Sequence, residues 1–199
     1  MNYYISDMHL GYGKIIGTSH RPDKSVNEMN ERIIHAINQT VNKQDKLYIL
    51  GDVACYYYNP VHLLKRILCE KILIEGNHDA RWLKDYRFRN CFSNIYANRI
   101  VHDGEYKIFL SHYPMAEWDG YYKGIYLFYG HIHNAANRAA AVMNLYENAV
   151  NVSLDCIQRP RTAEELITFR KAHFHPEVSP EKLLEKWKVE KYIESEEKK

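Results

Sequence analysis

The first 80 residues alternate short strand-like runs with helix-like segments, and a polar side chain follows each run. Between the runs, residues 26–41 carry apolar side chains at helical spacing. Asn59-Pro60 is typical of a helix start, which predicts a second helix to about residue 70. Strands that alternate with helices favour a largely parallel sheet, and therefore an α/β fold. The runs lie at residues 3–6, 47–50 and 71–74.

The second half of the chain predicts another group of strands. Asp103-Gly104 is a turn pair between two apolar runs, which indicates a hairpin over residues 100–110. We expect further strands at 125–129 and 149–153, a helix at 163–171, and a short helix or a lid within 134–148. We assign residues 1–178 to one domain, and 179–199 to a charged helix and tail.

Composition excludes several classes of protein. With 27 Lys and Arg against 25 Asp and Glu, the formal net charge of +2 gives no electrostatic case for nucleic-acid or membrane binding. The longest apolar runs are far shorter than the roughly 20 residues of a membrane span. The first residues lack a basic region followed by an apolar stretch, so we expect no signal peptide and a cytoplasmic location. The four cysteines are widely spaced and are expected to be reduced.

Side chains of the kind that bind metals follow five of the predicted strands. One histidine at a strand end is more often a structural residue than a ligand, but the full set would meet at one edge of the sheets. Residues two apart on an extended segment point to the same side, so the Asp-x-His and His-x-His pairs can each converge on one point. The set comprises Asp7, His9, Asp52, Asn77, His112, His131 and His133.

Residues 76–79 (Gly-Asn-His-Asp) follow the third strand-like run directly. Alone, this tetrapeptide could be an ordinary turn, because Gly, Asn and Asp all favour turns. Within the larger set it can be part of an active site. Its position in the set favours the second interpretation.

This mixture of imidazoles with carboxylate and amide oxygens suits a pair of divalent ions. It favours Mn²⁺, with Fe²⁺ or Zn²⁺ as alternatives, over Mg²⁺ or Ca²⁺, which prefer oxygen ligands alone. Asp52 is the natural bridge, since a carboxylate can bind two cations. Two ions about 3.5–4 Å apart can generate a bridging hydroxide and neutralise phosphoryl oxygens, as in phosphatases and nucleases.

Five motif blocks resemble those of the calcineurin-like metallophosphoesterase superfamily. They are Asp7-x-His9, Gly51-Asp52, Gly76-Asn77-His78-Asp79, His112 and Gly130-His131-x-His133. Ser6-Asp7-x-His9-Leu10-Gly11, Arg21-Pro22 and residues 151–155 also resemble a group of small, single-domain bacterial and phage phosphoesterases. The resemblance implies a four-layer α/β/β/α sandwich of two mixed sheets flanked by helices.

The resemblance also implies a role for each residue. Asp7, His9 and His133 would hold one metal, Asn77, His112 and His131 the second, and Asp52 would bridge them. His78 would contact the phosphate, as would Asn77 from its metal, and His78 would protonate the leaving oxygen. Asp79 would orient His78. Arg21 could bind phosphate, or it could be an ordinary surface residue before a proline.

We therefore expect a dinuclear metal-dependent hydrolase that cleaves phosphoesters by in-line attack of a metal-bridging hydroxide. The substrate would be a small phosphoester or a nucleotide, and the sequence does not choose between diester and monoester. The near-neutral charge argues mildly against a nucleic-acid track. The alternative is a non-catalytic metal-binding scaffold or interaction module of the same fold, which would not need His78. The sequence leaves the oligomeric state open.

Overall fold

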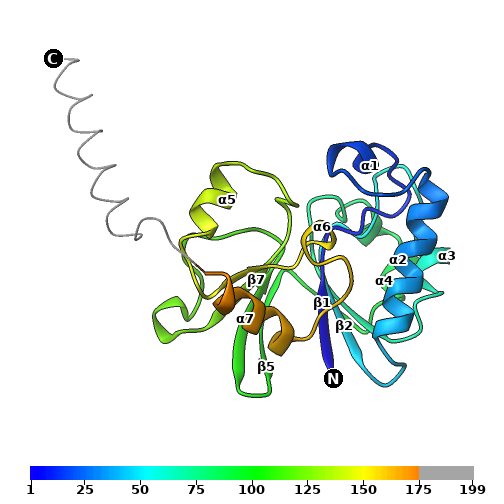
Figure 1. The fold of residues 1–199 in the computed structure, drawn as a ribbon. Coiled ribbons are helices and arrows are strands. Elements are labelled where there is room, and N and C mark those ends of the chain that lie inside the picture. Colours follow the sequence, from blue (N-terminus) through cyan, green and yellow to red (C-terminus); the bar gives the residue numbers. More distant parts are fainter. Residues whose placement is uncertain (175–199) are drawn as a thin grey trace, which may run out of the picture.

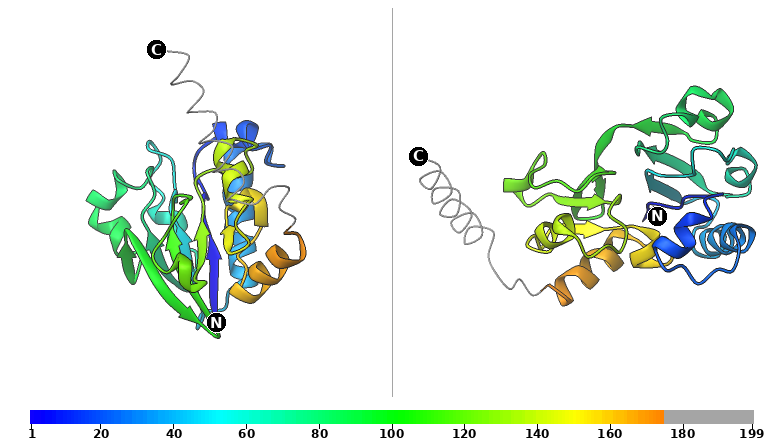
Figure 2. Two further views of the ribbon diagram at one scale, coloured as in Figure 1. Left: turned by 90° about the vertical axis from the view of Figure 1, so that its left-hand side faces the viewer. Right: turned by 90° about the horizontal axis from the view of Figure 1, so that it is seen from above.

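A computed structural model describes residues 1–174, which form two four-stranded sheets stacked between helices (Figures 1 and 2). This arrangement confirms the predicted four-layer α/β/β/α architecture. The predicted helix and tail at residues 179–199 lie outside the described residues, and the boundary at residue 178 stays a prediction.

The first sheet is built from the first half of the chain and is parallel throughout. Its strands pair in the order β1-β2-β3-β4, so only the other sheet is mixed. The strands are β1 (Asn2–Ile5), β2 (Lys46–Leu50), β3 (Glu70–Ile74) and β4 (Asn94–Tyr96). The helical segments between them are α1 (Lys14–Thr18), α2 (Val26–Thr40), α3 (Val61–Leu64), η1 (Trp82–Lys84) and α4 (Tyr86–Arg89).

The second sheet combines one antiparallel pair with two parallel pairs. The predicted hairpin is present, and Gly104 makes its turn with a φ of 60°. The strands are β5 (Asn98–Asp103), β6 (Tyr106–Ser111), β7 (Tyr126–Tyr129) and β8 (Ala149–Asn151), in that order. The remaining helices are η2 (Tyr121–Lys123), α5 (Arg138–Met143), α6 (Leu154–Ile157) and α7 (Ala163–Ala172).

Alternating side chains hold the four layers together. In β1, Tyr3 and Ile5 face α2, whereas Tyr4 faces the second sheet. In β7, Phe128 meets Tyr4 edge-on between the sheets, whereas Leu127 faces the outer layer that contains α5. Because successive strand residues point to opposite faces, each sheet supplies one surface to the central core and one to its helices.

One predicted helix ends earlier than expected, and the Ser-x-x-Glu pattern at residues 25–28, which is typical of a capping box, is only half formed. The helix expected from Pro60 to about residue 70 ends at Leu64, because β3 already begins at Glu70 in register with β2. Ser25 caps α2 by accepting a hydrogen bond from the Glu28 amide, but the Glu28 carboxylate accepts from Lys24. The reciprocal capping box is found instead at Thr162, where α7 begins.

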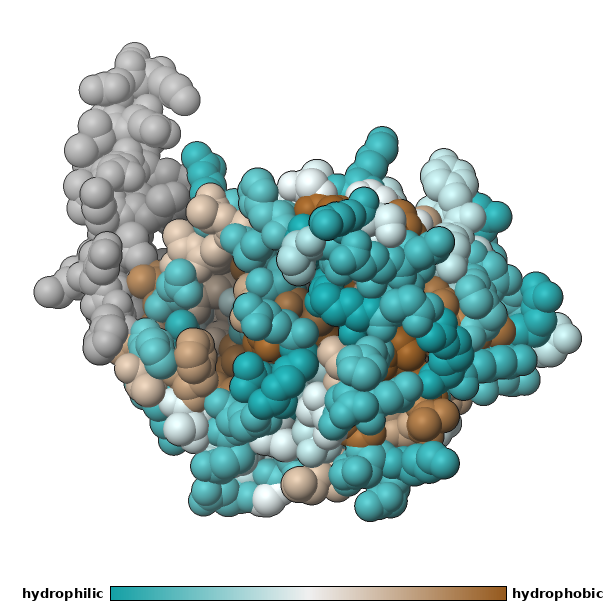
Figure 3. Space-filling view, turned by 45° about the vertical axis from the view of Figure 1, so that its right-hand side comes forward, coloured by the Kyte–Doolittle hydropathy of each residue, from teal (hydrophilic) through white to brown (hydrophobic). Residues whose placement is uncertain are grey.

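No helix within residues 1–174 has the length and apolar character needed to cross a lipid bilayer. Figure 3 shows one face of the molecule, on which hydrophilic residues predominate and apolar ones form only small, separate patches.

Candidate metal centre

The seven predicted ligands come together at one edge of the two sheets. Each follows the carboxyl end of a strand: β1, β2 and β3 in the first sheet, and β6 and β7 in the second. Ligand atoms of these residues and of His78 form three groups, and the atoms within each group all lie within 4.8 Å of one another. The groups are Asp7 with His9 and His133, His9 with Asp52 and His78, and Asp52 with His112 and His131.

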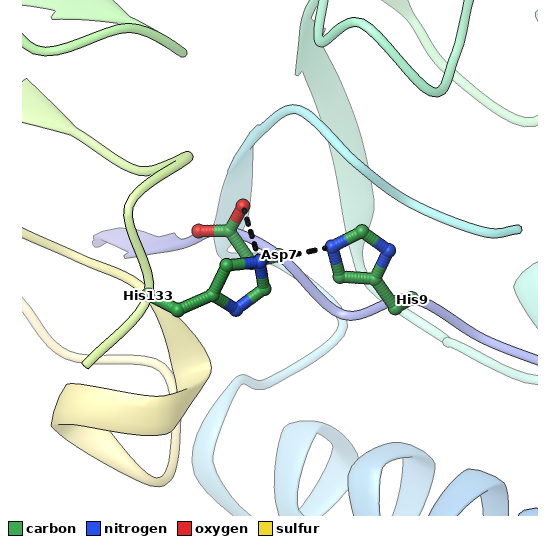
Figure 4. Close-up of side chains that lie close together, drawn as sticks. All are labelled: Asp7, His9 and His133. Carbon is green, nitrogen blue, oxygen red and sulfur yellow. Dashed lines mark hydrogen bonds and ion pairs between the residues drawn. The ribbon is translucent and has the colours of Figure 1, made fainter. Parts of the chain in front are cut away.

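The first cluster consists of Asp7, His9 and His133, which point toward one another (Figure 4). His9 Nε2 lies 3.3 Å from His133 Nε2, and the latter lies 4.0 Å from Asp7 Oδ1. Both Asp7 oxygens accept a hydrogen bond from the His131 amide, and Oδ2 also accepts from Ser6. Asp7 and His9 are buried, whereas His133 is partly exposed.

The second cluster consists of Asn77, His112 and His131. The Asn77 side-chain oxygen lies 3.0 Å from His112 Nε2 and 3.1 Å from His131 Nδ1. His112 is buried and its Nδ1 faces the Leu50 carbonyl oxygen at 2.8 Å, whereas Asn77 and His131 are exposed. This cluster is therefore the more open of the two.

Asp52 lies between the clusters and faces both. Its Oδ2 is 3.5 Å from His9 Nε2, and its Oδ1 is 3.5 Å from His112 Nε2. The carboxylate is only 3% exposed. One buried carboxylate thus directs one oxygen to each group of imidazoles.

Most of the ligand positions have an unusual backbone conformation. Seven non-glycine residues of the described chain have positive φ, and five of them belong to the predicted ligand set. These five are Asp7, His9, Asp52, His131 and His133. Left-handed conformations cost non-glycine residues about 1–2 kcal/mol each and concentrate at functional sites. Sharp turns at the strand ends direct the side chains into the cluster.

Two glycines allow the strand ends to approach one another. A Cβ on Gly51, whose φ is 82°, would lie 2.4 Å from His112 Nδ1. A Cβ on Gly76 would lie 2.5 Å from both the amide nitrogen and Oδ1 of Asp52. Gly76 has no positive φ, so the close approach, and not a sharp turn, excludes a side chain there.

The charges within the clusters are strongly perturbed. Burial raises the pKa of the Asp7 carboxyl, although His133 and His112 lower it. Burial, reinforced by His133 and His78, lowers the pKa of His9 to about 2. Burial also lowers the pKa of His131. The rings of His9 and His131 are therefore held in the neutral form, which offers a nitrogen lone pair.

This donor set fits divalent cations. Imidazole nitrogens and carboxylate or amide oxygens converge at short distances, and this set of donors contains no lysine or arginine to balance its carboxylates. A bound cation would favour the ionised form of Asp7, which burial otherwise disfavours. His9, Asp52 and His112 are each no more than 2% exposed, so a cation held there would be largely shielded from water.

The structure corrects the role predicted for Asp79. Its carboxylate accepts hydrogen bonds from the amides of Gly76, Asp52 and Val53 at 2.9–3.0 Å, and no bond to the His78 ring is found among the described residues. Burial raises the pKa of Asp79 to about 7, although the Gly76 and Val53 amides oppose that shift. Asp79 joins two ligand loops and does not orient His78.

His78 lies beside His9 and Asp52 and is partly exposed. Its amide donates to Asp52 Oδ1, which fixes the loop, and its Nε2 lies 3.9 Å from Asp52 Oδ2. The ring meets that of His9 edge-on, with the centroids 5.0 Å apart. The side chain is 38% exposed, so it can reach a molecule that approaches from solvent.

Arg21 does not lie where a phosphate could reach it. Its side chain is 2% exposed, and its guanidinium donates to the Asp155 carboxylate and to the carbonyl oxygens of Asp7 and Met8. Neither the phosphate-binding role nor the surface position considered for it fits this burial. The sequence had grouped Arg21 with residues 151–155 only through a family resemblance.

Asp155 was missed as a site residue. Its Oδ2 lies 2.6 Å from His133 Nδ1, and its carboxylate accepts two hydrogen bonds from Arg21. Burial opposes ionisation of Asp155, but the bonds from His133 and Arg21 lower its pKa overall. Burial by itself would lower the pKa of His133, but Asp155 and Asp7 outweigh it, so the pKa of His133 is raised overall. Asp155 lies 22 residues from His133, so local spacing gave no signal.

Comparisons with known proteins identify the family of the chain. The sequence profile of the family described as calcineurin-like phosphoesterase matches residues 3–192. The chain is 28% identical over 194 residues to the uncharacterized protein MJ1445 of Methanocaldococcus jannaschii, covering 96% of this chain and 95% of that protein.

Solved structures include similar folds. The Aquifex aeolicus protein AQ665, described as of unknown function, superimposes with a TM-score of 0.65 at 23% identity, covering 83% of this chain and 96% of that one. This match supports the fold alone. The nuclease MPE of Pseudomonas putida matches with a TM-score of only 0.42 at 18% identity, over 66% of this chain and 60% of its own.

Proposed function

The chain belongs to the calcineurin-like phosphoesterase family and is a hydrolase of phosphoester bonds, and from this premise we propose that it uses two divalent metal ions to cleave small phosphoesters or nucleotides. The observation that carries this proposal is the position of Asp52. Its two oxygens face two separate imidazole clusters, each at 3.5 Å. A single bridging carboxylate between two sets of donors is suited to a pair of ions.

In this proposal each ion takes donors from both sheets. Asp7, His9 and His133 hold the first, Asn77, His112 and His131 hold the second, and Asp52 contacts both. When bound, the two ions supply Lewis acidity, which neutralises phosphoryl oxygens and favours ionisation of water at neutral pH. The proposed ions are Mn²⁺, with Fe²⁺ or Zn²⁺ as alternatives.

His78 supplies a proton in the proposed reaction. Its ring is partly exposed, and its amide holds it beside Asp52. A substrate phosphate that reaches the clusters from solvent meets Asn77, His131 and His78, which with His133 are the exposed or partly exposed members of the set. This position supports the proposed role of His78, which is to hydrogen-bond the phosphate and to protonate the leaving oxygen.

The substrate is proposed to be small. A formal net charge of +2 offers no extended basic track for nucleic acid. The cytoplasmic location and the choice between diester and monoester remain predictions.

The first test strips the metal from the protein, adds Mn²⁺ back, and compares hydrolysis of bis-p-nitrophenyl phosphate with that of p-nitrophenyl phosphate. Metal-dependent turnover is the expected result, and a preference for the diester would point to a phosphodiesterase. A preference for the monoester would redirect the proposal to a phosphatase. Two bound ions with no turnover of either compound would favour the non-catalytic scaffold.

The His78→Ala variant separates catalysis from metal binding. We expect turnover to fall by about 10²–10⁴-fold, the usual contribution of a general acid, while both ions remain bound. Metal content by elemental analysis and turnover of the diester give the two readouts. Unchanged turnover would remove His78 from the mechanism.

A further inference from the structure

Arg21 connects parts of the chain that are distant in sequence. It follows α1, and its guanidinium reaches the backbone after β1 and the side chain of Asp155 in α6. Nε and Nη2 donate to the Asp155 oxygens at 2.8 and 3.1 Å. Nη1 donates to the Met8 carbonyl at 2.8 Å, and Nη2 to the Asp7 carbonyl at 2.7 Å. All three guanidinium nitrogens are therefore engaged.

Asp155, which Arg21 holds in place, in turn contacts the ring of His133. Its Oδ2 lies 2.6 Å from His133 Nδ1, and its side chain is 2% exposed. A carboxylate at this nitrogen keeps the proton on Nδ1 and leaves the lone pair of Nε2 free. That Nε2 is the atom that faces His9 and Asp7.

The segment that Arg21 holds has a strained backbone. Asp7 and His9 both have positive φ, and the carbonyl groups of Asp7 and Met8 lie between their side chains in the sequence. The Nδ1 of His9 is buried without a hydrogen-bond partner among the described residues, so no hydrogen bond orients the ring from behind, as Asp155 does for His133. The orientation of the His9 ring therefore depends on ring contacts and on the backbone after β1, and Arg21 bonds to that backbone.

We propose that Arg21 and Asp155 form a clamp that positions both histidines of the first cluster without touching metal or substrate. This inference rests on the proposed function, because it assigns the clamp to the metal site formed by Asp7, His9 and His133. Asp155 fixes the His133 ring directly, and Arg21 fixes both Asp155 and the Asp7–His9 backbone.

The clamp acts on only one of the two sites. In the second cluster, His112 Nδ1 faces a backbone carbonyl, and His131 Nδ1 faces the Asn77 oxygen. Neither ring contacts Arg21 or Asp155 within the described part of the chain. Removing the clamp therefore weakens one site and spares the other, which a general loss of structure would not do.

The test is a calorimetric titration of metal-stripped protein with Mn²⁺. In Asp155→Asn, we expect binding at one of the two sites to weaken by about 10–100-fold, a typical effect of losing a partner behind a ligand, with the other unchanged. Asp23→Asn is the matched control. Asp23 has a side chain 1% exposed and accepts two hydrogen bonds from Arg32, each 2.7 Å, outside the metal clusters. It should leave both affinities unchanged.

Arg21→Lys provides a second, independent variant. It keeps the positive charge but loses the paired bonds to Asp155 and the simultaneous contact with both carbonyls. The same site should weaken as in Asp155→Asn, by a smaller factor. Thermal unfolding of the metal-free proteins, compared with Asp23→Asn, separates this loss from lost stability.

Each outcome is decisive. Two sites of wild-type affinity in both variants would overturn the clamp and leave the proposed function intact. Equal weakening at both sites, or weakening in Asp23→Asn as well, would reduce the pair to a general structural contact. A wild-type protein that binds no Mn²⁺, Fe²⁺ or Zn²⁺ would overturn the proposed function, and the clamp with it.

Discussion

The two ends of the sheets are built by different means. At the ligand end, five non-glycine residues have left-handed backbone, and buried carboxylates are held by backbone amides. At the opposite end, glycine makes the hairpin turn, a capping box starts α7, and the N-terminal amine pairs with Asp45. Strain is therefore concentrated where the proposed chemistry lies, and the opposite end carries ordinary stabilising contacts.

This comparison makes a general expectation for variants. Changes at the ligand end should affect metal binding or turnover, and those at its buried carboxylates should also lower the free energy of unfolding. Changes at the opposite end should affect the free energy of unfolding and leave both of those properties alone.

The largest effect is expected for Asp79→Asn. Three backbone amides at the ligand end donate to this buried carboxylate, and an asparagine amide group would face one of them with a second donor. Leaving a buried backbone amide without an acceptor should lower the free energy of unfolding by roughly 3 kcal/mol. Denaturant unfolding of the metal-free protein measures the loss.

Asp45→Asn serves as the comparison from the opposite end. Asp45 accepts hydrogen bonds from the N-terminal amine and from Asn42. These partners remain accessible to water, so a smaller loss is expected. Equal losses in the two variants would remove the distinction between the ends.

A smaller effect, with a pH signature, is expected for Tyr4→Phe. Tyr4 is fully buried between the sheets, and its hydroxyl donates to Asp103 at 2.8 Å, near the hairpin turn. Removing this bond should cost about 1 kcal/mol at neutral pH, without loss of metal binding. Burial, followed by the charge of Asp103, raises the pKa of Tyr4 well above its ordinary value.

The raised pKa gives the sign of the pH dependence. Above about pH 10 the unfolded chain ionises this tyrosine while the folded chain keeps the proton, so the stability that Tyr4 contributes is lost as the pH rises. Wild type and Tyr4→Phe should therefore converge between about pH 8 and about pH 11 in unfolding free energy. A gap that stays constant over this range would contradict the prediction.

The smallest effect is expected for Gln158→Gly. Gln158 is exposed, follows α6, and has a φ of 63°, but it is not among the proposed ligands. Glycine adopts this conformation without steric cost, so stability should rise by roughly 0.5–1 kcal/mol, with metal binding unchanged. Gln158→Ala, which keeps a Cβ, should give no such gain. A loss in the glycine variant would show that positive φ is not a source of strain in this chain.

Sequence patterns predicted the features that depend on residues close together in the chain. Apolar runs, turn pairs and helix starts lie within a few residues of one another, so the strands, the hairpin and the polar residues at the strand ends could be placed. The helix after Pro60 was predicted too long, because its end is determined by pairing of β3 with β2, a long-range contact.

The supporting contacts of the site could not be predicted in the same way. Asp79 bonds to amides 26 and 27 residues away, and Arg21 bonds to a carboxylate 134 residues away. Their side chains carry no local sign of these partners, so Asp79 was assigned to its neighbour His78 and Arg21 to phosphate. The burial of a charged side chain is a tertiary property.

The division of the ligands between two sheets also determines when, during synthesis and folding, a metal ion could bind. On the proposed assignment, a growing chain that has reached only the first sheet carries Asp7, His9, Asp52 and Asn77, but none of the three later histidines. Neither ion then has its full set of donors until His131 and His133 have emerged and the second sheet has docked on the first. Metal uptake would thus follow assembly of the sandwich, and a bound ion would link its two halves against unfolding.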